Sequence, residues 1–391
     1  MSAAKKCFEG TEVMDLTCAG KRNIPSIDAS EDESLDSILL KYAKALLSQT
    51  PCMRMQDIRQ RETLFENKKC IGIIYSTIKF CDYYDFEYSK LRDFRLPILR
   101  IETDFTDQSY GQLMTRLEGF RETIDKTGTG KRVQKRMDGK YFAGIDSGST
   151  STELVIIDKD LNIIKQIMVK TGANAAVGAQ NALEKSGIDA KDIAHITATG
   201  YGRKNIGFAD SNVTEITCHA KGAKHLYAPA ETIIDIGGQD SKIITLDKDG
   251  AVTGFVMNDK CAAGTGRFLE NMAKVLELDM NEMAGIGLKY KNDLTISSMC
   301  TVFAESEVVS LIAENHKVAD IVHGLNKSVA VKIKALAAGA KSKGEIIMTG
   351  GVANNKGVVK EIEKQLERKV HIPKNPEFCG ALGAALIAAE S

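Results

Sequence analysis

One pattern of strands and turns occurs twice in the sequence, 89 residues apart (235 − 146), and this repeat limits the folds that the chain can adopt. Each copy is an apolar, β-favouring run that ends in an aspartate and a glycine turn, followed by a return run, an acidic turn and a third run. The copies span 141–169 and 232–257, with Asp146 and Asp235 before the glycine turns. In both, the acidic turn starts 12 positions after that aspartate (158 − 146 and 247 − 235). Two copies so far apart predict two similar lobes with a ligand cleft between them, rather than a stacked array.

The glycine turns predict a phosphate-binding site. Closely spaced backbone N–H groups can surround phosphate oxygens, and glycine lets the phosphate approach the backbone. One hairpin alone would be interpreted as a plain turn, but two matched hairpins and a third Gly-Gly turn after the run 346–349 favour nucleotide binding. Asp146 and Asp235 are placed to hold Mg²⁺ through water, because this ion gives up its hydration shell reluctantly. Hydroxyl donors in the first turn are Ser147, Ser149 and Thr150.

Two cysteines, Cys261 and Cys300, each follow polar residues and precede a predicted helix. Free N–H groups and the helix dipole lower the pKa of a thiol at a helix start, which favours soft metals or redox chemistry. An iron–sulfur cluster normally takes four thiolates, so two copies of the chain are predicted to share one cluster. The alternative is a pair of small buried apolar residues. The remaining thiols Cys7, Cys70, Cys218 and Cys379 are interpreted as structural. His219 is interpreted as a histidine on a helix surface, and the alternative is a histidine that borders the cleft.

The chain before the repeat divides into three parts. Residues 1–34 are polar and predicted to be irregular. Residues 35–124 alternate helical and β-favouring runs, with strands expected near 70–75 and 97–102, which predicts half of a doubly wound parallel sheet. Residues 125–140 are rich in Gly, Lys and Arg and predict a linker; Lys131 is followed by Arg132 instead of Ser or Thr, which excludes a P-loop.

Composition narrows the functional classes. Fifty-two basic and 52 acidic residues give zero formal net charge, so no nucleic-acid or membrane partner is expected. The sequence has no long apolar run and no signal-peptide pattern. Nine scattered cysteines do not suggest a disulfide framework, and they favour a reducing cytoplasm.

Residues 141–391 resemble the fold of actin, sugar kinases and heat-shock ATPases, and more narrowly the activator ATPases of 2-hydroxyacyl-CoA dehydratases and their benzoyl-CoA reductase relatives. The resemblance implies a homodimer with one 4Fe–4S cluster between the subunits, ligated by Cys261 and Cys300 of each. It also implies ATP-driven transfer of low-potential electrons to a dehydratase or reductase partner, with a ferredoxin or flavodoxin as the upstream donor. The motifs that carry it lie at 144–150, 199–203, 235–240, 258–268, 300–307 and 349–353.

Together these observations predict an α/β chain: a two-lobed ATPase at 141–391 and a small N-terminal α/β domain at 35–124. ATP and Mg²⁺ are expected between the lobes, and hydrolysis is expected to change the angle between the lobes and the exposure of the cluster. Asp146, Asp235 and Gln239 are the predicted catalytic residues, with Gln239 orienting the attacking water. Predicted ATP contacts are Ser147, Gly148, Ser149, Thr150, Gly237 and Gly238, with Gly350 and Gly351 near the adenosine.

Residues 15–124 resemble the C-terminal part of the dehydratase component itself, without that family's N-terminal half. Cys18, Cys52 and Cys81 are therefore interpreted either as ligands of a second cluster or as ordinary thiols of a docking domain, and both interpretations stay open. Two rival functions also stay open for the two-lobed part. One is a sugar or acetate-type kinase, which transfers phosphate without iron. The other is a sensor or chaperone-like ATPase without redox chemistry.

Overall fold

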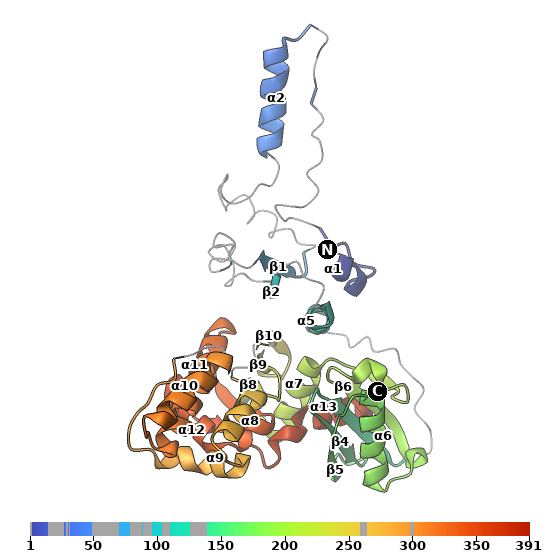
Figure 1. Ribbon diagram of the computed structural model, residues 1–391. Helices are drawn as coiled ribbons and strands as arrows, with labels where there is room; N and C mark the ends of the chain where they lie inside the picture. Colours follow the sequence, from blue (N-terminus) through green and yellow to red (C-terminus); the bar gives the residue numbers. More distant parts are fainter. Residues whose placement is uncertain are drawn as a thin grey trace. The chain divides into compact units, whose positions relative to one another are not determined.

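The computed structural model describes residues 2–14, 27–28, 30, 32–48, 70–78, 88, 96–103, 110–125, 139–258, 264–297 and 301–391 (Figure 1). The chain divides into two compact units, Met1–Ile124 and Asp125–Ser391, called here the N-terminal unit and the C-terminal unit. Within the described part of the chain, no helix combines the length and the apolar character needed to cross a membrane.

The N-terminal unit contains a parallel pair of strands, β1 and β2, as the sequence predicts. Helix α5 packs beside β1, because Gly72 leaves room for Phe120 and Ile124. The prediction of an irregular start is wrong for the first helix, α1, which buries Ala3, Ala4 and Cys7. Cys18, Cys52 and Cys81 lie outside the described residues. The sequence also predicts helices after Pro51 and near 84–94, and these too lie outside the described residues, Tyr88 apart. The bounds are α1 (Ser2–Cys7), α2 (Leu35–Ser48), β1 (Ile73–Ile78), β2 (Ile98–Thr103) and α5 (Tyr110–Ile124).

The first lobe of the C-terminal unit is built on a five-stranded sheet in the order β5-β4-β3-β6-β7. Strands β3, β4 and β5 are antiparallel neighbours, which is the predicted hairpin with its third strand, and β6 and β7 continue the sheet in parallel. Helix α6 starts where the Asn174 side chain accepts the N–H of Ala176, and it ends at Gly187, whose φ of 69° suits glycine. The bounds are β3 (Tyr141–Ser147), β4 (Ser151–Ile157), β5 (Ile163–Lys170), α6 (Ala175–Ser186), β6 (Ile193–Thr199) and β7 (Ser211–Asn212).

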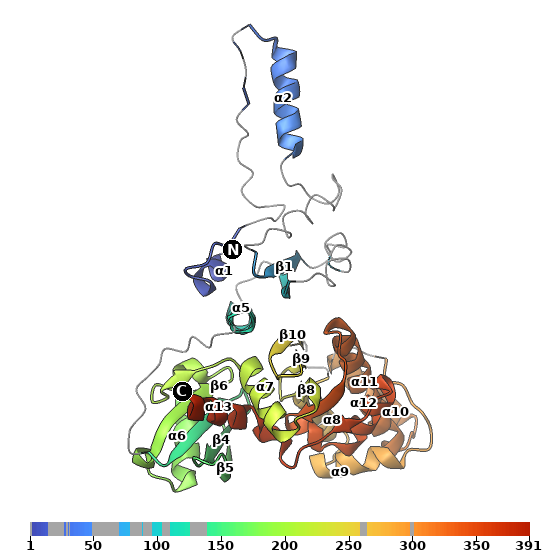
Figure 2. The ribbon, with the colours of Figure 1, turned by 180° about the vertical axis from the view of Figure 1, so that it is seen from behind.

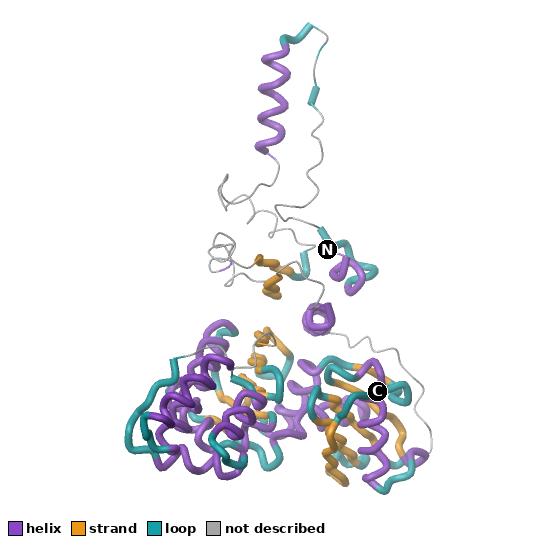
Figure 3. Tube along the Cα trace, in the orientation of Figure 1, coloured by secondary structure: helices purple, strands orange, loops and turns teal. Residues whose placement is uncertain are grey.

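The second lobe repeats this sheet, with the order β10-β9-β8-β11-β12 and the same sequence of antiparallel and parallel pairs. The duplication predicted from sequence is therefore confirmed strand by strand. The second lobe differs by the helices α8 to α11 between β10 and β11, which surround its core (Figure 3). The bounds are β8 (Ala230–Ile236), β9 (Ser241–Leu246), β10 (Val252–Asn258), α8 (Gly266–Val275), α9 (Met280–Ile286), α10 (Thr301–Ala313), α11 (Val318–Gly339), β11 (Glu345–Thr349), α12 (Lys356–Leu366) and β12 (Val370–His371).

Two helices, α7 (Glu215–Leu226) and α13 (Cys379–Glu390), lie between the lobes in both views (Figures 1 and 2). Each follows the last strand of one lobe and covers the sheet of the other. From α13, Leu382 and Leu386 pack on β3 and β4 of the first lobe, whereas Ile216 and Ala220 of α7 pack on β8 and β9 of the second. The lobes are therefore joined through one helix pair, and any change in their angle must pass through it.

The two central helices cross at very short range. An added Cβ at Gly222 or at Gly383 would overlap the backbone of the opposite helix. Glycine at both positions allows this backbone-to-backbone approach. The predicted fold class, two duplicated lobes of the actin, sugar kinase and heat-shock ATPase type, is confirmed.

Candidate nucleotide site

Asp146 and Asp235 occupy equivalent positions at the carboxyl ends of β3 and β8, one in each lobe. The neighbouring parallel strand places a threonine beside each of them, with Thr199 in register with Asp146 and Thr349 in register with Asp235. A glycine with φ near +80° follows each threonine, at +82° for Gly200 and +81° for its counterpart. The duplication thus extends to a Thr-Gly pair in each lobe, so the third glycine turn at 350–351 is the equivalent of the loop that begins at Gly200.

The glycine turns of the two lobes approach each other. A Cβ added at Gly238 would lie 2.8 Å from the Oγ1 atom of Thr150, which belongs to the other lobe. A Cβ at Gly200 would lie 2.5 Å from the Oδ1 atom of Asp146, and one at Gly350 would overlap the backbone of Ile236. Glycine is required here both for the positive φ and for the close approach of the loops to the carboxylates.

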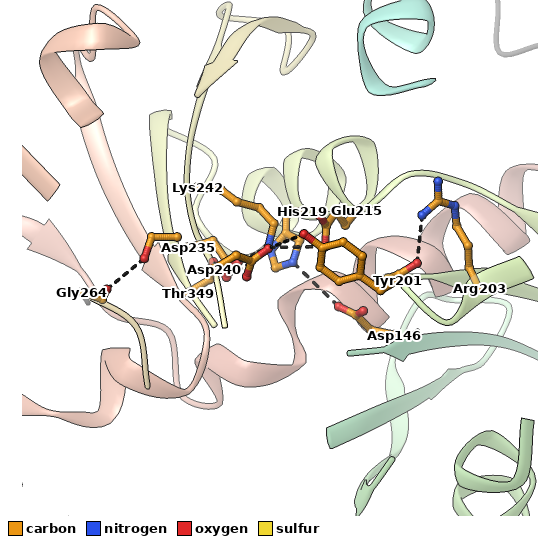
Figure 4. Close-up of polar contacts among 12 residues, drawn as sticks. Asp146, Tyr201, Arg203, Glu215, His219, Asp235, Asp240, Lys242, Gly264 and Thr349 are labelled. Atoms are coloured by element: carbon orange, nitrogen blue, oxygen red, sulfur yellow. Dashed lines mark hydrogen bonds and ion pairs between the residues drawn. The ribbon is translucent and has the colours of Figure 1, made fainter. Parts of the chain in front are cut away.

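His219 lies between the two aspartates (Figure 4). Its Nε2 atom is 3.8 Å from Oδ2 of Asp146, and its Nδ1 atom is 3.6 Å from Oδ1 of Asp235. The side chain is only 6% exposed, so the prediction of a surface histidine is wrong. The physical reason is the position of α7, which is covered on both sides by the lobes. Gly380 of α13 lies against both His219 and Asp146, because a Cβ there would lie 2.9 Å from His219 Nε2 and would overlap the Asp146 carboxylate.

Lys242 brings a buried positive charge to the second-lobe aspartate. Its ammonium group is 3.2 Å from Asp235, 2.9 Å from Asp240 and 3.4 Å from Glu215, and the residue is 3% exposed. Burial alone lowers the pKa of an ammonium group, but Asp240, Glu215 and Asp235 outweigh it and raise the pKa of Lys242 well above its usual value. The lysine is therefore a permanent cation of the site.

The acids around Lys242 differ in pKa. Burial raises the pKa of Asp235, but His219, Lys242 and a 2.8 Å hydrogen bond from Thr349 together lower it to about 2. Burial raises the pKa of Glu215 to about 8; the charge of Lys242 lowers this pKa, and the nearby acids, Asp240 first, raise it. Asp235 is therefore the more readily ionised of the two acids.

The first-lobe aspartate has the opposite environment. Its register partner on β4 is Glu153, a second buried acid, where the second lobe has Lys242. Burial raises the pKa of Asp146, and the charges of His219 and Lys242 compensate only in part. Burial and the nearby Asp146 raise the pKa of Glu153 to about 8. The two lobes, alike in backbone, therefore differ in electrostatics: the residue opposite the aspartate is a buried acid with a raised pKa in the first lobe and a buried lysine in the second.

Most residues predicted to contact the nucleotide lie on the two facing turns and the Gly350 loop. Ser147 is buried, and its hydroxyl is 3.4 Å from that of Thr152. Ser149, Thr150, Gln239 and Gly351 are exposed, whereas Gly148, Gly237, Gly238 and Gly350 are half-buried. Sequence reasoning missed the group around Lys242. The signal available was a lysine in the return strand, seven positions after the aspartate, where the first copy has a glutamate (242 − 235 and 153 − 146).

Cys261 and Cys300 lie outside the described residues, and the described residues contain no group of three or more His, Cys, Asp or Glu placed to hold a metal ion. Helix α8 begins at Gly266 after the N-cap residue Thr265, five positions after Cys261 (266 − 261). Gly264, with φ of +93°, precedes that cap. Helix α10 begins at Thr301, directly after Cys300.

Helix α8 is tied to the second-lobe turn. The N–H of Gly266 donates to the carbonyl of Gly237 at 2.9 Å, and the N–H of Arg267 donates to that of Gly238 at 2.9 Å. Phe268 of α8 and Ala304 of α10 belong to one hydrophobic cluster. The described neighbours of both cysteines are therefore packed together in the second lobe, beside a predicted phosphate turn.

The duplicated lobes, paired acidic turns and central helices define an ATPase-type protein. Residues 143–388 match the BadF/BadG/BcrA/BcrD ATPase family, and the chain belongs to this family. Residues 1–124 match the D-component of 2-hydroxyglutaryl-CoA dehydratase. The predicted resemblance is thereby confirmed for both parts of the chain.

Several named relatives are dehydratase activators. The chain is 47% identical over 255 residues to the activator of lactoyl-CoA dehydratase of Anaerotignum propionicum, covering 64% of this chain and 98% of that protein. It is 42% identical over 252 residues to the 2-hydroxyisocaproyl-CoA dehydratase activator of Clostridioides difficile, covering 63% and 94%. A solved structure of that activator, with bound ADPNP, superposes with a TM-score of 0.62 over 64% of this chain and 94% of the other.

Proposed function

We propose that this protein is an ATP-dependent electron-transfer activator that delivers low-potential electrons to a 2-hydroxyacyl-CoA dehydratase, a benzoyl-CoA reductase or a related iron–sulfur partner. One observation carries the proposal: the C-terminal unit is similar to named dehydratase activators over 94% and 98% of their length. The D-component match at 1–124 supports the same reaction system, because activator-type and dehydratase-type sequences occur here in one chain.

In this proposal the ATP phosphates bind between the facing turns of the two lobes. Asp146 and Asp235 hold Mg²⁺ through water, and Gln239, exposed in the turn after β8, orients the attacking water. Gly148, Gly237 and Gly238 let the phosphates approach the backbone, and Gly350 and Gly351 lie near the adenosine. The carboxylates at equivalent ends of β3 and β8 support this arrangement, since each lobe contributes one acid.

Cys261 and Cys300 would hold half of a 4Fe–4S cluster, and a second copy of the chain would supply the other half. Bound there, the cluster supplies one-electron chemistry at low potential. The number of available ligands agrees with a cluster shared between two chains, because each chain offers two thiolates in this region and the cluster takes four. Helix α10 supports the second copy as the partner: it starts directly after Cys300 and exposes four apolar side chains, Val302 (67%), Phe303 (68%), Val309 (52%) and Ile312 (41%).

Helix α8 supplies the connection from nucleotide to cysteine. Its first two N–H groups are bonded to the carbonyls of Gly237 and Gly238, so displacement of this turn by a phosphate shifts the start of α8. The residues just before that start include Cys261. A change at the phosphate turn is therefore transmitted over a few residues to one cysteine segment.

The proposal is tested by anaerobic purification and iron and sulfide analysis. The wild-type dimer is expected to contain about two irons and two sulfides per chain, because two chains share one cluster. Cys261→Ser and Cys300→Ser should lose most of the iron, whereas Cys70→Ser, a matched change in the N-terminal unit, should keep it. A colourless, iron-free wild-type dimer contradicts the cluster.

The same preparations separate the rival functions. ATP-dependent reduction of a dehydratase-type acceptor, with a reduced ferredoxin or flavodoxin as donor, supports the activator. Phosphorylation of a sugar or acetate by an iron-free protein would instead identify a kinase. Steady ATP turnover without electron transfer to any such acceptor would identify a non-redox sensor.

A further inference from the structure

Lys242 marks the largest chemical difference between the two otherwise duplicated turns. On the neighbouring antiparallel strand, Glu153 is paired with Asp146 in the first lobe, and Lys242 is paired with Asp235 in the second. Burying an ammonium group is costly unless it is paired, and this one is 3% exposed. The site therefore maintains a buried positive charge at the second-lobe turn, where the first lobe has an acid.

A hydrogen bond from the first lobe reaches this lysine pair. The hydroxyl of Tyr201, in the loop after β6, donates to Oδ2 of Asp240 at 3.3 Å. The same Oδ2 atom is 2.9 Å from the Lys242 ammonium group, which also lies 3.2 Å from Oδ2 of Asp235. Figure 4 shows the Tyr201 hydroxyl pointing toward Asp240. One chain of contacts thus runs from a first-lobe loop to the second-lobe aspartate.

The Tyr201–Asp240 contact depends on the distance between the lobes. The loop 199–203 is fixed to the first lobe, because the N–H of Gly202 donates to the carbonyl of Ser147 at 3.0 Å. Asp240 is fixed to the second-lobe turn, since its carbonyl accepts the N–H of Gly237 at 3.0 Å. Rotation of one lobe away from the other breaks the hydrogen bond between Tyr201 and Asp240. Lys242 then keeps its contacts with Asp235 and Asp240 but loses the link to the first-lobe tyrosine.

We propose that Tyr201, Asp240 and Lys242 form a positioning chain, in which closure of the lobes fixes the Asp235 carboxylate for ATP hydrolysis. This inference rests on the ATP hydrolysis of the proposed function, and does not depend on the cluster or on the acceptor. Contacts in such a chain polarise one another in a low-dielectric site, so the hydroxyl acts on Asp235 through the shared ammonium group. Lys242, which acts through its contacts with Asp240 and Asp235, is the positioning residue.

The test is a double-mutant cycle on the full-length chain, purified without oxygen, with kcat and KM for ATP measured by phosphate release. Tyr201→Phe is expected to lower kcat about ten-fold, the size of one hydrogen bond to a charged group, and to change KM less than two-fold. In the Asp240→Asn background, Tyr201→Phe should have no further effect, because the two residues act through one contact. Tyr227→Phe is the matched control: it removes a tyrosine–carboxylate bond of 3.1 Å to Glu345 elsewhere in the same unit and should leave kcat unchanged.

Lys242→Met should lower kcat at least as much. Since it leaves buried carboxylates without their cation and endangers folding, thermal unfolding is recorded for every variant and the tyrosine cycle carries the test. An unchanged kcat in Tyr201→Phe, a rise in KM alone, or an equal loss in the Asp240→Asn background would each overturn the positioning chain. Wild-type protein without ATP turnover would overturn ATP hydrolysis itself and the positioning role with it, so the two failures are distinguishable.

Discussion

Replacing Gly383 with alanine tests how closely α7 and α13 must cross for the site to work. The added Cβ would overlap the carbonyl oxygen of Cys218 and would lie 2.6 Å from its carbonyl carbon and 2.9 Å from the nitrogen of Gly222. These atoms are backbone, so no side-chain rotation relieves the contact. Ordinary carbon contacts are about 3.5–4 Å, and the helices must therefore separate by roughly 1 Å.

Two opposing effects determine the change in stability. Overpacking of a well-packed core typically costs about 1–3 kcal/mol, and here the displaced helix also carries Leu382 and Leu386 away from the first-lobe sheet. Alanine regains up to about 1 kcal/mol of helix propensity over glycine. The net loss of about 1–2 kcal/mol corresponds to a fall in Tm of roughly 2–8 °C for a unit of this size.

The activity should fall further than the stability. Gly380, one turn earlier in α13, lies against His219 and the Asp146 carboxylate. A displacement of about 1 Å at a reacting group can cost roughly 100-fold in rate. We therefore expect the kcat for ATP to drop about 10- to 100-fold in protein that is still folded at the assay temperature.

Calorimetry and phosphate release on the full-length chain measure both effects. The matched control is Gly285→Ala in α9, where an added Cβ meets nothing within 4 Å, so this variant should be as stable as wild type or slightly more stable, with normal kcat. Gly383→Ala protein with wild-type Tm and kcat would refute the close crossing of the two helices as a requirement.

Three further substitutions test separate features. Glu153→Gln should flatten the pH dependence of stability. The pKa of Glu153 is about 8 in the folded protein and 4.5 ordinarily, so between these pH values the native state holds a proton that the unfolded state has lost. Wild-type stability should therefore fall between about pH 4.5 and 8, which denaturant midpoints at several pH values would show. If the variant keeps the full wild-type fall, another group is responsible. Thr349→Val removes the 2.8 Å hydrogen bond to Asp235 and should lower stability by about 1–3 kcal/mol and reduce kcat, measured by urea unfolding and phosphate release; Thr349→Ser should restore most of both. Asn355→Ala removes the N-cap of α12 and should cost about 1 kcal/mol without changing KM, and a loss of ATP affinity would contradict a purely capping role.

The architecture was largely predictable because it rests on local patterns. The alternation of apolar runs and glycine turns in 141–169 and 232–257 predicts antiparallel strands, and the constant 12-residue spacing predicts two copies of one lobe. The parallel strands of the N-terminal unit follow from the same kind of pattern at 70–75 and 97–102. Local sequence determines these elements because strand pleat and turn conformation depend on neighbouring residues.

The crossing of α7 and α13 was not predictable in this way. Each helix covers the sheet of the opposite lobe, and only this exchange buries His219 between two aspartates. A pattern of polar and apolar residues indicates that a helix has an apolar face, but not which lobe that face meets. The start of α8 at Gly266 was not predictable for a related reason, because the Gly264 turn and the bonds of α8 to Gly237 and Gly238 depend on the neighbouring hairpin.

The duplicated fold, the two acidic glycine turns and, through its motifs, the ATPase family all follow from the amino-acid sequence. The different environments of the two turns follow from tertiary contacts. A glutamate and a lysine stand at the same spacing after Asp146 and Asp235, but that Glu153 and Lys242 are buried opposite these aspartates is visible in the fold alone. The charge of a carboxylate depends on burial and on charges within a few ångströms, and in this protein those charges come from β4, β9, α7 and the opposite lobe.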